Sequence, residues 1–355
     1  MVRDEAAVRE RVAALVTSAV LPDGWKLPEV FVEWLELGGV PVGLVGLVAT
    51  HTDTGAEVTG SAAEREFFPV ERACYELIER LWTTHAMRHP LRRYAVGQEG
   101  EPHAEVRAEA LFPEAEGGLC LSRSNGVAAH PDRAMACRNA RLELVERDRV
   151  LRSWFGFVAP VHSMTPPDLC GWLSDSIEWH VGELPPVPGH DLGPSADGVG
   201  VAFCVALPRR ERVPLACGFA ARGSREAAQA AAIRECVQVL GFLWGEDLPQ
   251  SSPSPEPAPR FHQAFYLATD NHARVRAWLE GRHCELRVRH EGAVARAKYR
   301  PSSIPNGLVD LAPELGSRCA VVHVIDERYW PLVFGAKHPR VNDAVASCIG
   351  PHPIS

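Results

Sequence analysis

A short pattern of acidic and apolar residues occurs twice in the sequence, and each copy fits one face of a helix. Residues 73–80 read ACYELIER, and residues 140–147 read ARLELVER. A third segment, residues 233–238, keeps the first glutamate of the pattern and has glutamine in place of the second. Side chains three positions apart share a face of a helix, so each segment predicts two acidic or amide side chains side by side. The pairs are Glu76 with Glu79, Glu143 with Glu146, and Glu235 with Gln238.

The apolar residues around the three copies differ, and they predict different degrees of burial. In the first copy, Leu77 and Leu81 fall on the side of the helical wheel opposite the glutamates, which is typical of a surface helix. In the second copy, Leu142 and Val150 flank the carboxylates, and the third copy is apolar on every side. A helix that is apolar all round is normally buried. We therefore expect the second and third copies to carry buried carboxylates.

Buried carboxylates constrain the chemistry of the protein. Clustered acidic groups repel one another unless cations lie between them. Mg²⁺ prefers oxygen ligands and is usually bound together with phosphates. The sequence contains no GxxxxGK[ST] segment and no GxGxxG segment after a strand. We therefore expect any bound ATP to be held through carboxylate-coordinated Mg²⁺ rather than through a glycine-rich phosphate loop.

Helical and strand-like segments alternate along the chain, which indicates an α/β or α+β fold of sheets packed with long helices. Helices are predicted at residues 1–20, 63–90, 131–155, 224–244 and 272–279. Strands are predicted at residues 30–52, 117–121, 199–207, 214–220, 284–288 and 320–325. The ten cysteines stand singly without a CxxC pair, which argues against a zinc site.

A change of composition divides the chain. Residues 249–260 are rich in proline and serine and predict an extended, exposed connector. We expect an N-terminal helix and lead-in over residues 1–29 and a core with the three carboxylate segments over residues 30–248. Residues 261–355 would complete the same domain and end in a proline-bearing tail. Residues 1–29 are too few for a leader-binding domain of their own.

Charge and hydropathy exclude two classes of function. Lys and Arg number 37 against 45 Asp and Glu, a net charge of −8, which argues against a protein that binds nucleic acid through charge. The longest apolar run, residues 40–49, is half the length of a membrane-spanning helix, and the N-terminus lacks the apolar stretch of a signal peptide. We expect a cytoplasmic protein.

The ordered segments resemble the YcaO family. Residues 124–129 read SNGVAA and precede the second copy of the carboxylate pattern. Residues 270–273 and 330–335 are similar to later family segments, so the resemblance spans roughly residues 30–340. It implies a YcaO-like fold in which long helices converge on a site for ATP and Mg²⁺.

The resemblance also implies site residues. The expected Mg²⁺ ligands are Glu76, Glu79, Glu143, Glu146 and Glu235. The expected ATP-binding residues are Ser124, Asn125, Glu76, Arg80, Glu143, Arg147, Glu235 and Gln238. The sequence departs from the family at residues 59–63, which read TGSAA where members often have a Gly-Lys-Gly or serine-rich approach, and at Ala73, which has no hydroxyl. No catalytic base is identified.

The reaction implied by the resemblance is ATP-dependent activation of a backbone amide in a ribosomally made precursor peptide. A nucleophile adds to the amide carbonyl, and the resulting oxyanion takes the γ-phosphoryl group of ATP before phosphate leaves. A side chain or an amine as nucleophile gives an azoline or a macroamidine, whereas external sulfide gives a thioamide. A non-catalytic scaffold that docks the peptide is the alternative from another class.

Partners and the role of the C-terminal tail are left open by the sequence. The precursor peptide is the expected substrate, with or without a separate leader-binding or sulfur-transfer protein, and a homodimer is an open alternative. Pro351 and Pro353 match in part the alternating prolines that end many azoline-forming members. The alternative is a disordered terminus.

Overall fold

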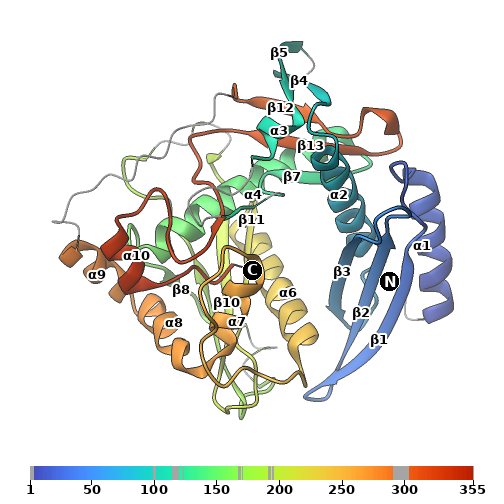
Figure 1. The fold of residues 1–355 in the computed structure, drawn as a ribbon. Coiled ribbons are helices and arrows are strands. Elements are labelled where there is room, and N and C mark those ends of the chain that lie inside the picture. Colours follow the sequence, from blue (N-terminus) through green and yellow to red (C-terminus); the bar gives the residue numbers. More distant parts are fainter. Residues whose placement is uncertain are drawn as a thin grey trace. The chain divides into compact units, whose positions relative to one another are not determined.

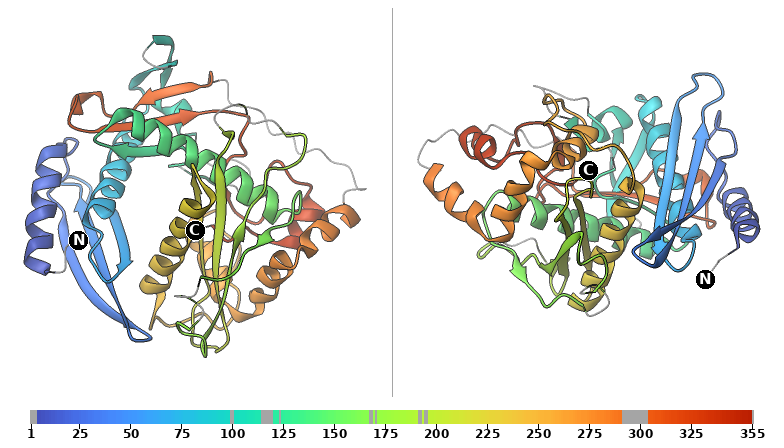
Figure 2. Two further views of the ribbon diagram at one scale, coloured as in Figure 1. Left: turned by 180° about the vertical axis from the view of Figure 1, so that it is seen from behind. Right: turned by 90° about the horizontal axis from the view of Figure 1, so that it is seen from below.

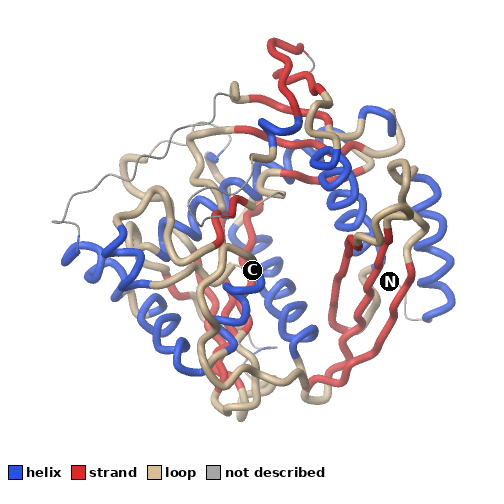
Figure 3. The backbone as a smooth tube through the Cα atoms, in the orientation of Figure 1, coloured by secondary structure: helices blue, strands red, loops and turns tan. Residues whose placement is uncertain are grey.

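The computed structural model describes residues 4–98, 101–113, 120–122, 124–166, 169, 171–190, 193, 196–290 and 304–354. Helices and antiparallel sheets are both well represented (Figures 1 and 3), which confirms the expected mixed α/β (α+β) class. The chain forms two compact units, each built from separate stretches of sequence. Unit 1 comprises residues 1–113, 123–141 and 302–326, and unit 2 comprises residues 114–122, 142–301 and 327–355.

Unit 1 begins with a three-stranded antiparallel sheet and two helices that share a core. The strands are β1 (Glu29–Leu37), β2 (Val40–Thr50) and β3 (Glu57–Arg65), in the order β1-β2-β3. The helices are α1 (Glu5–Ala19) and α2 (Val70–Arg88). Both lie on the same face of the sheet, because buried residues of both helices join those of β2 and β3 in one cluster (Figure 1).

A second sheet of unit 1 has five strands in the order β5-β4-β12-β13-β7. Its elements are β4 (Arg93–Gln98), β5 (Glu101–Arg107), β7 (Val127–His130), β12 (Gly307–Asp310) and β13 (Ala320–Ile325), with the short helices α3 (Ala108–Leu111) and η3 (Pro313–Leu315). Its central strands pack their buried residues against Ile78 and Trp82 of α2. Strands from the middle and the end of the chain therefore pair in one sheet.

Unit 2 is organised around a four-stranded sheet in the order β11-β10-β9-β8. Its strands are β8 (Val161–His162), β9 (Ile177–Glu183), β10 (Gly200–Pro208) and β11 (Ala216–Arg222). Helix α6 (Arg225–Leu243) packs on β10 and β11 (Figure 2). The close approach requires glycine at residue 218, since a Cβ atom there would lie 2.2 Å from the carbonyl oxygen of Ala232.

The remaining elements of unit 2 include α8, which lies over the sheet through Trp278. Its ring centroid is 5.2 Å from that of Phe203 in β10. These elements are α7 (Pro259–Leu267), η2 (Thr269–Asn271), α8 (His272–Leu279), α9 (Arg282–His290), α10 (Asp343–Ile349) and a two-stranded sheet of β6 (Cys120–Leu121) and β14 (Val333–Phe334). The long helix α4 (Arg133–Trp154) contributes to both units, and the division falls after Arg141.

Most predicted helices are confirmed, with two errors along the chain. Residues 57–65 pair with β2 as β3, so the helix expected from residue 63 begins at Val70. The strand expected at residues 284–288 is wrong because these residues lie in helix α9. Contacts with the end of α4 hold this helix in place: His283 Nδ1 lies 2.7 Å from the Trp154 oxygen, and Arg287 Nε donates to the Gly156 oxygen at 2.9 Å. Of the strand expected at residues 117–121, residues 117–119 lie outside the described residues.

The proline-rich connector and the C-terminal tail differ in how far they are buried. Residues 249–258 of the expected connector contain no helix or strand and are mostly exposed, whereas residues 259 and 260 belong to helix α7. Residues 350–354 are mostly buried, and the backbone oxygens of Gly350 and Pro351 accept hydrogen bonds from Trp154 and Tyr266. The alternative of a disordered terminus is therefore wrong for residues 350–354. No helix in the described part of the chain combines the length and the apolar character needed to cross a membrane.

Buried histidines in unit 2 make folding depend on pH. Burial lowers the pKa of His262 and of His283 to about 4 and that of His338 to about 3, from 6.5. His262 is held in its neutral form, since Nδ1 donates to the His352 oxygen (2.8 Å) and Nε2 accepts from the Gly335 nitrogen (2.9 Å). Between pH 6.5 and 4 the unfolded chain binds more protons than the folded chain, so stability falls as the pH falls.

We expect each of these histidines to cost about 1.4 kcal/mol of unfolding free energy per pH unit in that window. Urea unfolding at a series of pH values measures the slope. The variant His283→Asn keeps a donor near the Trp154 oxygen and removes one titrating group, so its slope should be smaller than that of the wild type. An equal slope would contradict the assignment.

Candidate functional site

Two glutamates from different helices of unit 2 bind the backbone of the same strand. Glu146 of α4 accepts a hydrogen bond from the Ala221 nitrogen at 3.2 Å. Glu235 of α6 accepts one from the Phe219 nitrogen at 3.3 Å. Strand β11 is the edge of its sheet, so every second N–H group along it points away from β10 and needs another partner. The carboxylates of the second and third copies therefore meet at the free edge of β11.

Arg147 lies among the carboxylates of this cluster. Its Nη2 atom is 3.5 Å from Glu143 Oε1, and its Nη1 atom is 3.4 Å from Glu146 Oε1. Burial acts to lower the pKa of Arg147, but the charges of Glu146, Glu143 and Glu235 outweigh it and raise the pKa. Burial raises the pKa of Glu146, against the opposing charges of Arg147 and Arg222. Three carboxylates thus surround one buried guanidinium group.

The residues of this cluster fit a magnesium–phosphate group. Arg147 Nε and Nη1 are buried and have no hydrogen-bond partner among the described residues. Both can donate to a phosphate oxygen. The nearby carboxylates supply oxygen donors, which Mg²⁺ prefers. No group of three or more His, Cys, Asp or Glu side chains in the described ranges is arranged to hold a metal ion by itself. Mg²⁺ commonly takes one or two carboxylates and completes its shell with water and phosphate oxygens, so the donor set suits the ion in company with a nucleotide.

The first copy of the carboxylate pattern lies in unit 1. Hydrogen bonds and an ion pair hold two of its side chains, unlike those of an ordinary solvated helix face. Glu76 accepts a hydrogen bond from the Ser61 nitrogen at 2.8 Å and pairs with Arg80 at 2.6 Å. Arg80 also donates to the Thr59 oxygen at 3.0 Å. Burial raises the pKa of Glu76, with Arg80 opposing it. The segment in which the sequence departs from the family therefore supplies the backbone that holds this pair.

A glycine lets α2 approach this segment. A Cβ atom on Gly60 would lie 2.4 Å from the Ala73 oxygen, so a larger residue would push α2 away from β3. The side chain at residue 73 is fully buried and leaves no room for a larger group. Glu79 is half-buried on the same helix.

Ser124 and Asn125 form a turn before β7. The Val127 nitrogen donates to the Ser124 oxygen at 3.0 Å. The Asn125 Oδ1 atom is buried and has no hydrogen-bond partner among the described residues. Burial lowers the pKa of His323 to about 4, and the backbone of Asn125 opposes this shift. The turn is thus fixed by its backbone, and the Asn125 side chain keeps an acceptor for another group.

A family model described as "YcaO cyclodehydratase, ATP-ad Mg2+-binding" matches residues 102–325, more than half of the chain. The chain belongs to the YcaO family. It is an ATP-dependent peptide-modifying enzyme of the cyclodehydratase type, and its cofactors are ATP and Mg²⁺. A comparison with curated protein sequences gave no match.

Solved structures resemble this YcaO chain in fold. YcaO from Methanopyrus kandleri bound with AMPPCP and Mg²⁺ is 19% identical, with 91% of this chain and 90% of that chain covered and a TM-score of 0.52. The E. coli microcin synthetase McbBCD complex is 10% identical, with coverages of 92% and 96% and a TM-score of 0.49. A heterocyclase in complex with substrate and cofactor is 14% identical, with coverages of 83% and 48% and a TM-score of 0.44.

The predicted site residues of this YcaO enzyme fall into two groups. Unit 2 brings together Glu143, Glu146, Arg147 and Glu235, and Gln238 lies half-buried one turn further along α6. Unit 1 holds Glu76, Glu79, Arg80, Ser124 and Asn125. A common site for both groups stays a prediction. No residue pattern in the sequence points to the backbone nitrogens of Phe219 and Ala221, which only the edge position of β11 makes available.

Proposed function

We propose that this YcaO enzyme uses Mg-ATP to phosphorylate and activate a backbone amide of a ribosomally made precursor peptide, giving an azoline or a macroamidine. The carboxylate cluster at the free edge of β11 is the observation that carries the proposal. Its three glutamates and one arginine are acidic overall and are buried or half-buried, so a divalent cation with a polyphosphate suits them better than a neutral ligand. The family membership supplies the class of reaction.

The residues of unit 2 would act by binding and orienting. The Ala221 and Phe219 nitrogens fix Glu146 and Glu235, so each carboxylate presents its remaining lone pairs in a defined direction. The Arg147 Nε and Nη1 atoms, which make no hydrogen bond to a described residue, would donate to phosphate oxygens. Mg²⁺ bound there would offset charge on the phosphoryl group during its transfer. Glu143 and Glu146 would keep the Arg147 guanidinium in place between turnovers.

The folded tail supports the azoline branch of the proposal. Residues 350–354 pack within unit 2, and burial lowers the pKa of His352, with smaller contributions from the charges of His262, His338 and Arg147. The tail and the carboxylate cluster therefore lie within electrostatic reach of each other. We propose that the two prolines of the tail have the role that the alternating prolines have in azoline-forming relatives.

The proposal is tested with the purified chain, Mg-ATP and the short peptide encoded beside its gene. Formation of an azoline or a macroamidine should release ADP and phosphate and lower the peptide mass by one water. Addition of EDTA in excess of Mg²⁺ should stop both. A mass gain equal to exchange of oxygen for sulfur, in the presence of a sulfur donor, would assign the thioamide branch. A peptide of unchanged mass with no Mg-dependent ATP binding would contradict the proposal.

A further inference from the structure

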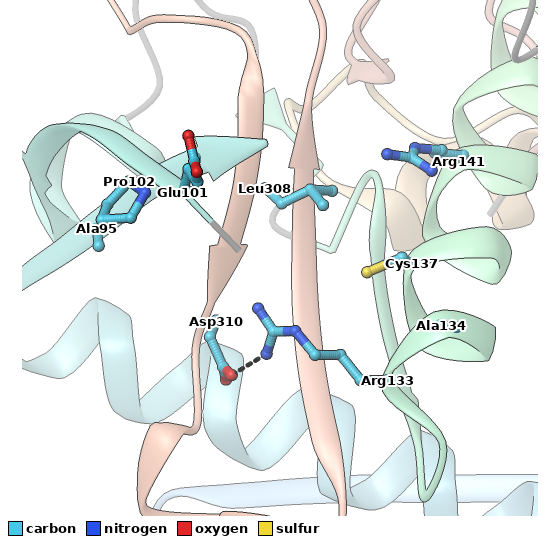
Figure 4. A pocket seen from close by; sticks show the side chains of 10 residues that line it. Ala95, Glu101, Pro102, Arg133, Ala134, Cys137, Arg141, Leu308 and Asp310 are labelled. Carbon is cyan, nitrogen blue, oxygen red and sulfur yellow. Dashed lines mark hydrogen bonds and ion pairs between the residues drawn. The ribbon is translucent and has the colours of Figure 1, made fainter. Parts of the chain in front are cut away.

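A groove crosses one face of the five-stranded sheet in unit 1, and it has a volume of about 630 Å³ (Figure 4). Its floor includes Ala95 of β4 and Leu308 of β12, and one wall is formed by Cys137 and Arg141 of α4. Glu101, the first residue of β5, forms the opposite wall. Val96 and Val309, the neighbours of the floor residues, belong to the core on the other face. Because successive side chains on a strand alternate between faces, the groove lies on the face opposite the core.

Two of the charged side chains that line the groove, one cation and one anion, are not neutralised by an ion pair with a described residue. Arg133 forms an ion pair with Asp310 at one end, and Asp310 also accepts a hydrogen bond from the Ala312 nitrogen at 3.1 Å. These two charges therefore balance each other. Arg141 and Glu101 have no ion pair with any residue that the structure describes, and Figure 4 shows them on either side of Leu308.

The pairing of β4 with β5 places Glu101 at the groove. The strand register shifts between Val96 and Gly97, and a Cβ atom on Gly97 would lie 2.4 Å from the Glu101 oxygen. Only glycine permits this approach. Backbone packing between Gly97 and Glu101 therefore helps to set the position of the anionic wall.

We propose that this groove docks an extended segment of the precursor peptide in which an apolar residue lies next to an acidic one. The apolar side chain would cover Leu308 and Ala95, and the acidic side chain would pair with Arg141. The volume lies within the range of ordinary ligand sites, about 300–1,000 Å³. This inference rests on the proposed function, because it takes the occupant from the substrate class of the enzyme.

The test measures equilibrium binding of the fluorescently labelled peptide encoded beside the gene, by anisotropy and without nucleotide. Arg141→Glu should weaken binding about tenfold, mainly at low salt. Arg138→Glu makes the same charge change on an exposed residue of α4 that does not line the groove, and it should leave affinity within about twofold of the wild type.

Two further variants sharpen the result. Replacing each acidic residue of the peptide by lysine in turn should yield one peptide that binds Arg141→Glu better than it binds the wild type. Ala95→Trp fills the groove from an exposed strand position and should raise KM for the peptide while kcat at saturating peptide is unchanged. Because the binding assay needs no ATP, it reports on the groove even if no modified product is found.

Three results would overturn the proposal. One is a wild-type protein that does not bind the peptide. The others are equal effects of Arg141→Glu and Arg138→Glu, and unaltered affinity in both Arg141→Glu and Ala95→Trp.

Discussion

Replacement of Glu146 by alanine is expected to lower ATP-dependent modification of the peptide below about one hundredth of the wild-type rate. The Glu146 carboxylate bonds the edge of β11 and lies 3.4 Å from Arg147. Its loss would remove an oxygen donor for Mg²⁺ and leave the buried Arg147 with fewer charges to balance it. ADP release and the change in peptide mass measure the rate, and nucleotide titration with and without Mg²⁺ measures binding.

A matched set of variants separates metal binding from folding. Glu143→Ala should behave like Glu146→Ala, since both carboxylates contact Arg147. Glu226→Ala removes an exposed glutamate from the first turn of α6 and should leave turnover near the wild-type rate. Thermal unfolding of each variant checks that the fold is retained. Near-normal activity in a folded Glu146→Ala variant would refute the assignment of this carboxylate to the metal.

The second large effect is expected in stability, from Asp148, the residue that follows the second copy of the carboxylate pattern. Its side chain is 1% exposed, accepts from Arg152 Nε at 2.8 Å and accepts from the Trp330 nitrogen at 2.9 Å. Asp148→Ala would remove the carboxylate that pairs with the buried Arg152, leaving the guanidinium its contact with the Trp330 ring at 4.7 Å, and would take away the acceptor of the Trp330 N–H. We expect the free energy of unfolding to fall by about 3–5 kcal/mol, as measured by urea denaturation.

Two comparisons isolate the cause of this loss. Asp148→Asn keeps an oxygen for the Trp330 nitrogen but removes the charge that pairs with Arg152, so its loss should be smaller than that of the alanine variant. Asp343→Ala breaks an exposed ion pair with Lys337 and should cost less than about 1 kcal/mol. Equal losses for Asp148→Ala and Asp343→Ala would show that the buried pair contributes no more to stability than an exposed pair.

Local signals in the sequence predicted several elements well. Ser224 accepts a hydrogen bond from the Ala227 nitrogen at 3.2 Å, as expected of a helix cap, and the third copy of the pattern follows on α6. Two apolar runs at residues 199–207 and 214–220 pair as β10 and β11. These signals are readable because caps, turns and apolar periodicity involve residues within a few positions of one another.

Features that depend on partners far away along the chain cannot be read from local patterns. Residues 284–288 alternate like a strand, but contacts with Trp154 and Gly156 hold them as a helix. The first copy reads as a surface helix, yet Glu76 is bonded to the Ser61 backbone. In both cases the partner residue is too far away along the sequence to be part of a local pattern.

The sequence by itself determined which side chains share a helix face, that the chain mixes helices with sheets, and, through its ordered motifs, the family and its use of Mg-ATP. Only the tertiary structure decided that Glu146 and Glu235 meet the backbone of one edge strand, that the tail is packed in unit 2, and that each unit combines separate stretches of the chain. The physical reason is that a free strand edge and a packing site for the tail exist only after strands have paired and helices have packed. The hydrogen-bond donors at a strand edge are backbone N–H groups, which every residue except proline carries. The identity of a residue therefore cannot show that its N–H group will be free to bind a side chain.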